Sequence, residues 1–187
     1  KGPGSYTGLR IGVSFAKGMC YALNIPLISV GSLDALVQVA REDYDAGIVD
    51  IEDEDWSKAT LCPMVDARRM EVYTQLFNGH GEALSEVEAK VIDEQSFAEE
   101  IASAEEFVIF GNGAAKCAGT LSERVKLIDI APSARGLARL AQEALDAFLA
   151  HLTNNAVNNR FRENGRTYVA VTVDNNALSR SLRETRL

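Results

Sequence analysis

The sequence is poor in the residues that build metal centres and covalent cross-links. Its 187 residues include only three cysteines and two histidines. Cys20, Cys62 and Cys117 lie far apart without a CxxC pair, and His80 and His151 have no metal-ligand spacing. This pattern argues against a disulfide scaffold and against a zinc or iron site made of His and Cys. We therefore expect three reduced, partly buried thiols and no bound metal.

Long apolar runs and positive charge are also scarce. No run approaches the roughly 18 residues of a membrane span. The 19 Lys and Arg residues stand against 27 Asp and Glu, which gives a net charge of −8. Because no apolar run is long enough, we expect no membrane insertion. Because phosphate contacts need a basic surface, we expect no direct nucleic-acid binding by the chain alone. Residues 152–187 nevertheless carry a net charge of +3, which leaves −11 for residues 1–151.

The apolar residues recur with periods that predict alternating strands and helices. Helical spacing is found in residues 9–23, 33–41, 97–104 and 132–149, and runs typical of strands in residues 27–30, 60–65, 71–77, 107–110, 125–130 and 167–173. The acidic segment 42–58 predicts a solvated loop, and the Asn-rich segment 153–166 predicts a linker. This order indicates an α/β or mixed layered fold. Since the chain begins at Lys1, we expect the natural protein to extend further upstream.

The most informative stretch is the glycine-rich segment 1–8 and the predicted helix after it. Glycine turns before a helix can bind phosphate, but no Gly-Lys-Ser/Thr follows, which excludes a Walker A loop. Gly8, Gly12, Ala16 and Cys20 recur every four residues, and such a small-residue stripe lets another helix approach closely. Two interpretations stay open, helix packing at an interface, which we favour, and phosphate binding.

Two further motifs lie at predicted turns. A Gly-Asn-Gly segment follows the buried strand at 107–110, as in phosphate-binding loops, although a plain tight turn is the interpretation that we favour. An Asp-Ala-Arg-Arg segment joins two strands and is either a charged site or a hairpin whose aspartate caps the loop. The candidate contacts for a phosphate or a partner are Asp66, Arg68, Arg69, Gly111, Asn112 and Gly113. No nucleophile with its base is recognisable, so we predict no catalytic residue.

Three blocks of the sequence resemble the TsaB family, formerly called YeaZ. They are residues 1–28 (KGPGSYTGLRIGVSFAKGMCYALNIPLI), 62–73 (CPMVDARRMEVY) and 110–117 (FGNGAAKC). The likeness covers about residues 1–150 in family order and is specific in the first two blocks. It implies an α/β fold of the actin-like, sugar-kinase-like ATPase type with ribonuclease H-like lobes, the first of them incomplete here. The implied segments are a remainder of the first lobe with an interface helix (1–41), a second lobe (42–151), and a linker with a basic tail unlike the family (152–187).

The resemblance also implies a role in tRNA modification. A TsaB-like protein is a non-catalytic, cytoplasmic subunit that binds and activates TsaD for the formation of N6-threonylcarbamoyladenosine at position 37 of tRNA. The ATPase TsaE joins this complex, and TsaB forms a homodimer when TsaD is absent. The subunit itself needs no cofactor, whereas the complex uses ATP or ADP. The interface residues carried over from the family are Leu9, Arg10, Gly12, Val13, Ala16, Lys17 and Cys20.

One alternative function comes from a different class of protein. The chain would then be a kinase-like enzyme that binds a nucleotide or phosphate with the loop formed by Gly111, Asn112 and Gly113. Binding of ATP and magnesium by the isolated chain would distinguish this enzyme from a subunit without catalytic residues.

Overall fold

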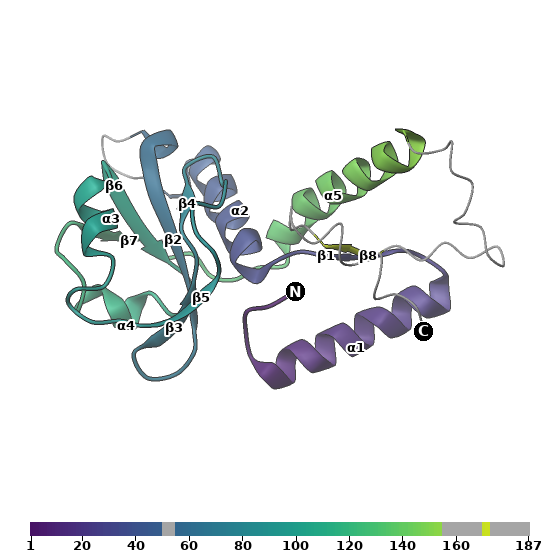
Figure 1. Cartoon of the computed structure of the whole chain (residues 1–187), viewed down its shortest axis with the longest axis horizontal. Coiled ribbons are helices and arrows are strands. Elements are labelled where there is room, and N and C mark those ends of the chain that lie inside the picture. Colours follow the sequence, from purple (N-terminus) through teal and green to yellow (C-terminus); the bar gives the residue numbers. More distant parts are fainter. Residues whose placement is uncertain (50–54, 155–169, 173–187) are drawn as a thin grey trace. The chain divides into compact units, whose positions relative to one another are not determined.

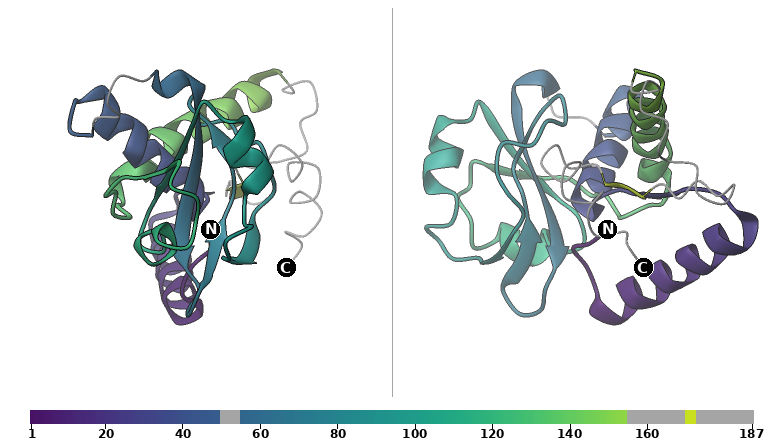
Figure 2. Two further views of the ribbon diagram at one scale, coloured as in Figure 1. Left: turned by 90° about the vertical axis from the view of Figure 1, so that its left-hand side faces the viewer. Right: turned by 45° about the vertical axis from the view of Figure 1, so that its right-hand side comes forward.

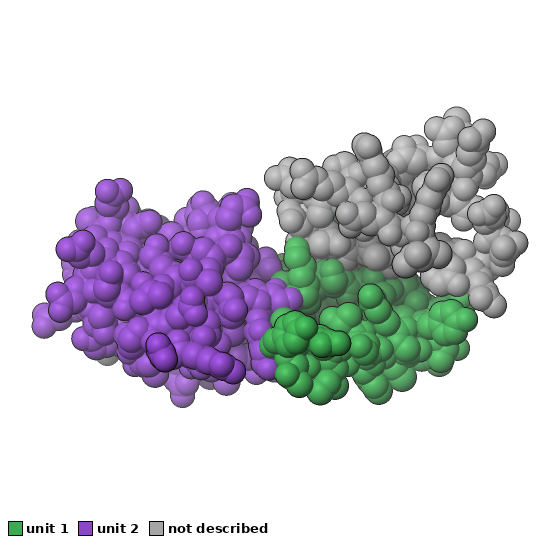
Figure 3. Space-filling model, turned by 60° about the horizontal axis from the view of Figure 1, so that its bottom comes forward, with its two compact units in different colours: residues 1, 6–31, 137–187 green, residues 2–5, 32–136 purple. Residues whose placement is uncertain are grey.

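The computed structural model describes residues 1–49, 55–154 and 170–172. The chain forms two compact units, coloured separately in Figure 3. Unit 1 comprises residues 1, 6–31 and 137–187, and unit 2 comprises residues 2–5 and 32–136. The two lobes expected from the family resemblance, residues 1–41 and 42–151, do not have the same boundaries as these two units, and they remain a prediction. Among the described residues, no helix combines the length and the apolar character needed to cross a membrane.

Unit 2 is built on a six-stranded mixed sheet. Five strands follow the order β5-β3-β2-β6-β7, and β4 pairs with β2. The strands are β2 (Ala59–Asp66), β3 (Glu71–Thr74), β4 (Phe77–Asn78), β5 (Glu88–Val91), β6 (Glu106–Phe110) and β7 (Val125–Leu127). β2, β6 and β7 run parallel, whereas β3 is antiparallel to β2 and β5. The four strands predicted in this unit are confirmed, although the run 71–77 is divided between β3 and β4.

The two central strands of this sheet are covered on both faces. Along a strand, successive side chains point to opposite faces, so a strand covered on both sides is a continuous apolar run. Leu61 and Val108 pack in one core with helix α2 (Ser32–Asp45). Cys62 and Ile109 pack in a second core with residues of α3 (Ala98–Ser103) and α4 (Ala115–Ala118). Figures 1 and 2 show α2 on one face of the sheet and α3 and α4 on the other.

The loop predicted at 42–58 is partly wrong. Helix α2 continues to Asp45, and Trp56 begins a short 3-10 helix, η1 (Trp56–Lys58). Trp56 is only 5% exposed, and its ring stacks on Tyr44 with 4.8 Å between the centroids. Burial of the large apolar ring is favourable, and the neighbouring carboxylates can stay in water while the ring is buried. The acidic neighbours therefore do not prevent the burial of Trp56. Residues 50–54 lie outside the described residues.

Unit 1 contains two helices and a two-stranded parallel sheet. The elements are α1 (Tyr6–Leu23), β1 (Leu27–Ser29), most of α5 (Arg135–Asn154) and β8 (Ala170–Thr172). Leu27 pairs with Ala170 in the register of this sheet. The predicted helix at 9–23 and the strands at 27–30 and 167–173 are confirmed where described. α5 extends into the linker predicted at 153–166, of which residues 155–166 lie outside the described part.

Candidate functional site

The surface of α1 is the first candidate site. The helix follows the glycine-rich turn, and none of its 18 residues is buried. It carries two basic residues and no acidic residue. Most of its exposed large side chains are apolar or aromatic: Tyr6, Ile11, Val13, Phe15, Met19, Tyr21 and Leu23. Contiguous apolar side chains on the surface of a soluble protein mark sites of interaction.

Helix α1 is apolar on two faces. Since an α-helix has 3.6 residues per turn, residues four apart lie on nearly the same face. Ile11, Phe15 and Met19 follow this spacing and are 66%, 68% and 46% exposed. We call these three residues the exposed face of α1. The other apolar face contains Leu9, Ala16 and Cys20, which are half-buried, and Val13, which is 42% exposed.

The predicted interface residues divide between two environments. Leu9, Ala16 and Cys20 are half-buried, whereas Arg10, Gly12, Val13 and Lys17 are exposed. A Cβ added at Gly12 would meet nothing within 4 Å, so the backbone there is open to a neighbouring helix. Sequence reasoning missed Ile11, Phe15 and Met19, although their four-residue spacing was visible in the sequence.

The turn between β2 and β3 is the second candidate site. The Asp66 carboxylate accepts a hydrogen bond from the backbone N–H of Arg68 at 3.3 Å and forms an ion pair with Lys116. Lys116 Nζ also donates to the Glu71 carbonyl oxygen at 2.8 Å. The hydrogen bond from Lys116, followed by that from the Arg68 N–H, holds the pKa of Asp66 below its usual value. Lys116 therefore contacts the residues at both ends of this turn, Asp66 and Glu71.

The Gly-Asn-Gly loop after β6 braces the same turn. The Asn112 side-chain oxygen accepts a hydrogen bond from the Asp66 N–H at 3.1 Å, and the Gly113 N–H donates to the Met64 carbonyl at 2.9 Å. Gly111 has φ +101°, and a Cβ there would lie 2.5 Å from the same carbonyl oxygen. The glycines thus permit close backbone contact, and the Gly113 N–H that a phosphate would need is already used. This geometry favours the tight-turn interpretation.

Arg68 and Arg69 are the cationic part of this second site. Both are exposed, and their φ angles of 86° and 47° are in the left-handed region that non-glycine residues seldom adopt. Neither forms an ion pair with a described residue. The fold brings Asp66 to Asn112 and Lys116 across 46 and 50 residues and leaves two guanidinium groups in solvent. Such a pair can bind a carboxylate or a phosphate.

Replacing Lys116 with methionine should raise the pKa of Asp66 toward the ordinary value of an aspartate. The hydrogen bond from Lys116 is the largest cause of the lowered pKa. Since that pKa is lowered in the folded state, its stabilising contribution is present above the unfolded-state pKa and is lost as the pH falls through the folded-state pKa. An NMR titration of the carboxyl carbon measures the change. Lys90→Met is the control, because Lys90 pairs with Glu88 and should leave the Asp66 titration unchanged.

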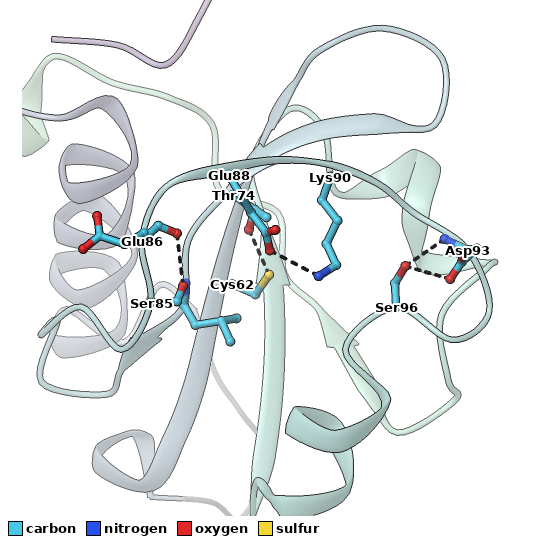
Figure 4. A network of polar contacts seen from close by, with 9 residues as sticks. Cys62, Thr74, Ser85, Glu86, Glu88, Lys90, Asp93 and Ser96 are labelled. Carbon is cyan, nitrogen blue, oxygen red and sulfur yellow. Dashed lines mark hydrogen bonds and ion pairs between the residues drawn. The ribbon is translucent and has the colours of Figure 1, made fainter.

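The thiols are placed for packing. All three are free, and Cys62 and Cys117 are buried. Cys62 Sγ lies 3.2 Å from Thr74 Oγ1 (Figure 4). Burial raises the pKa of Cys62 to about 12 and also raises the pKa of Cys117, which disfavours the reactive thiolate. No three His, Cys, Asp or Glu side chains in the described ranges come together as metal ligands.

The family model described as "TsaD: tRNA N6-adenosine threonylcarbamoyltransferase" matches residues 1–185. The chain belongs to this family. The match includes most of the segment 152–187, which we expected to be unlike the family. Residues 170–172 of this segment form β8, which pairs with β1.

Curated relatives place the chain in the TsaB group of this family. The protein from Bacillus subtilis named "tRNA threonylcarbamoyladenosine biosynthesis protein TsaB" is 40% identical over 87 residues, which cover 46% of this chain and 32% of that protein. The TsaB proteins of Haemophilus influenzae and Escherichia coli are each 33% identical over 73 residues, or 39% of this chain and 26% of theirs. The aligned region thus spans about a third or less of these relatives.

Two solved structures show the same fold. YeaZ from Pseudomonas aeruginosa superposes with a TM-score of 0.57 at 24% identity and covers 79% of this chain and 65% of that one. A second structure, described as an uncharacterized protein with similarity to peptidase YeaZ from Pseudomonas aeruginosa, has a TM-score of 0.59 at 23% identity. It covers 78% of this chain and 63% of that one. The actin-like α/β fold expected for a TsaB protein is therefore confirmed.

Proposed function

We propose that this TsaB-group chain is a non-catalytic subunit that binds and activates TsaD for the formation of N6-threonylcarbamoyladenosine in tRNA. Its family membership and the names of its relatives support this pathway. The observation that carries the proposal is the exposed face of α1, Ile11, Phe15 and Met19. Exposed apolar side chains of this kind mark a surface that a partner covers.

The interface that we propose combines this exposed face with the residues carried over from the family. Full burial of a Val, Leu, Ile, Phe or Met side chain contributes roughly 1.5 to 3 kcal/mol, so a few anchors suffice for a specific complex. Gly12 provides an open place on the backbone for a partner helix. Arg10 and Lys17 are exposed on a helix without acidic residues, which suits a partner that carries carboxylates at the rim.

The proposal extends to the assembly. The chain works in the cytoplasm and has no cofactor of its own. It joins TsaE in the presence of ATP or ADP and forms a homodimer through α1 when TsaD is absent. Contact with tRNA is left to the other subunits, because unit 2 carries 22 Asp and Glu against nine Lys and Arg. A surface with this balance repels the phosphate backbone.

The test combines binding with activity. Purified chain is titrated into TsaD in a calorimeter, and N6-threonylcarbamoyladenosine is measured with TsaD, TsaE, ATP and tRNA in the presence and absence of the chain. We expect a stoichiometric complex and modification that depends on the chain. No complex, or no stimulation by a folded chain, would refute the proposal. ATP and magnesium are also titrated into the chain alone, and binding with turnover would instead favour the kinase-like enzyme.

A further inference from the structure

Strand β5 ends the sheet of unit 2 and leaves one side open. It pairs with β3, and within the described part of the chain no strand pairs with its other side. Three large apolar side chains in and before it are exposed, with values of 58% for Leu84, 49% for Val87 and 64% for Val91. An open edge with apolar side chains can accept a further strand. This surface belongs to unit 2, whereas α1 belongs to unit 1.

The register determines which backbone groups point outward from β5. The Ile92 N–H donates to the Met70 carbonyl at 2.8 Å, directly beyond the end of the strand. In an antiparallel pair, alternate residues turn their N–H and C=O groups toward the partner. Lys90, two residues before Ile92, therefore also turns these groups toward β3. Ala89 and Val91 turn theirs to the open side, where they can form hydrogen bonds with another strand.

The sequence of this edge is complementary to itself. Residues 87–91 read Val-Glu-Ala-Lys-Val. When this segment is placed antiparallel to a second copy with Ala89 at the centre, Val87 lies opposite Val91, and Glu88 opposite Lys90. Ala89 lies opposite itself at a hydrogen-bonded position, which agrees with the outward direction of its backbone groups. Apolar residues thus face apolar residues, and each charge faces its opposite.

We propose that two copies of this chain pair antiparallel through β5, centred on Ala89, so that their two sheets become continuous. The contact is isologous, because the same residues serve on both copies. Its occupant is a second copy, because the order of charges and apolar residues matches the strand's own sequence read in reverse. This inference is independent of the proposed binding of TsaD by α1.

The charges on β5 are already arranged for this contact. Lys90 Nζ lies 3.2 Å from Glu88 Oε1 and 4.5 Å from the centre of the Phe97 ring, and Figure 4 shows the Glu88–Lys90 pair. In the paired copies, two such pairs lie side by side with alternating sign. They occupy non-hydrogen-bonded positions, where cross-strand side chains come closest. One short strand pair covers less area than a stable dimer needs, so we expect a weak dimer that depends on concentration.

Cysteine cross-linking tests the centre of the contact. Ala89→Cys in a Cys20→Ser chain places two thiols across the twofold axis with Cα atoms about 5.5 Å apart, within the range of a disulfide. Mild oxidation at high protein concentration should give a covalent dimer. Val91→Cys is the matched control, because its twofold mate is four residues, or about 13 Å, away. Equal cross-linking of both variants, or of neither, would overturn the proposed register.

Charge exchange tests the same contact without cysteine, in a Phe15→Glu chain, so that the homodimer proposed through α1 does not contribute to self-association. Glu88→Lys and Lys90→Glu each place like charges opposite one another, and each should weaken self-association in sedimentation experiments about tenfold. A mixture of the two variants should recover association as a heterodimer, and the double variant should recover it by itself. Circular dichroism confirms that every variant is folded. Association that is unchanged in both single variants, or that does not recover in the mixture, contradicts the proposal. A Phe15→Glu chain should self-associate through β5 as before, which separates this contact from α1.

Discussion

Replacement of Phe15 by glutamate is expected to weaken the binding of TsaD by about 100-fold, which corresponds to about 2.7 kcal/mol. The side chain is 68% exposed, so the free chain loses little internal contact and should keep its fold. In the complex, however, the charge would have to leave water for an apolar interface without a partner of opposite sign. Calorimetric titration measures the affinity, and thermal unfolding of the free chain verifies the fold.

The matched control for this variant is Ser14→Glu. Ser14 is also exposed and is the immediate neighbour of Phe15, but it lies about 100° away around the helix. It should change the affinity by no more than about threefold, since a rim charge has little effect. Equal affinities of the Phe15→Glu and Ser14→Glu variants would contradict this interface.

Replacement of Gly79 by alanine should reduce the free energy of unfolding by about 3 kcal/mol. An added Cβ would lie 1.8 Å from the Trp56 carbonyl oxygen and 2.8 Å from the Ser57 Cα. Both are backbone atoms, so relief requires movement of the segment that carries the buried Trp56 ring. Chemical denaturation followed by tryptophan fluorescence measures the loss, because the chain has a single tryptophan.

Gly119→Ala is the control for this prediction. An added Cβ at Gly119 meets nothing within 4 Å, and φ is −76° at this position after α4. Alanine adopts this conformation without strain and restricts the unfolded chain, so stability should stay equal or rise by up to about 1 kcal/mol. The two substitutions make the same chemical change, and equal unfolding midpoints would show that the close approach at Gly79 has no energetic consequence.

The elements of the fold were predictable where the signal is local. The helix beginning near Leu9 and the apolar run Phe107–Phe110 follow the periods of a helix and a buried strand, which depend only on neighbours in the sequence. Trp56 was misplaced, because its neighbours in the sequence are acidic whereas its neighbour in space is Tyr44. A local pattern contains no information about a ring supplied from a distant helix.

The candidate sites were likewise predictable only where the signal is local in the sequence. The motif around Asp66 and the glycines at 111 and 113 was visible, but Lys116 was not, because its pairing with Asp66 spans 50 residues. The small-residue stripe on α1 indicated an interface, yet the exposed face with Phe15 appeared only in the structure. When a helix is apolar on two faces, the sequence alone does not show which face is buried. The packing of the rest of the chain decides which face stays in water.

The sequence by itself determined the family, the alternation of strands and helices, and the scarcity of metal ligands, because composition and short-range spacing are properties of the linear chain. The tertiary structure alone decided that the Gly113 N–H is used in bracing a turn, that Ile11, Phe15 and Met19 are exposed, and that β5 is an edge strand. Each of these depends on which distant segments meet, and long-range packing sets those contacts.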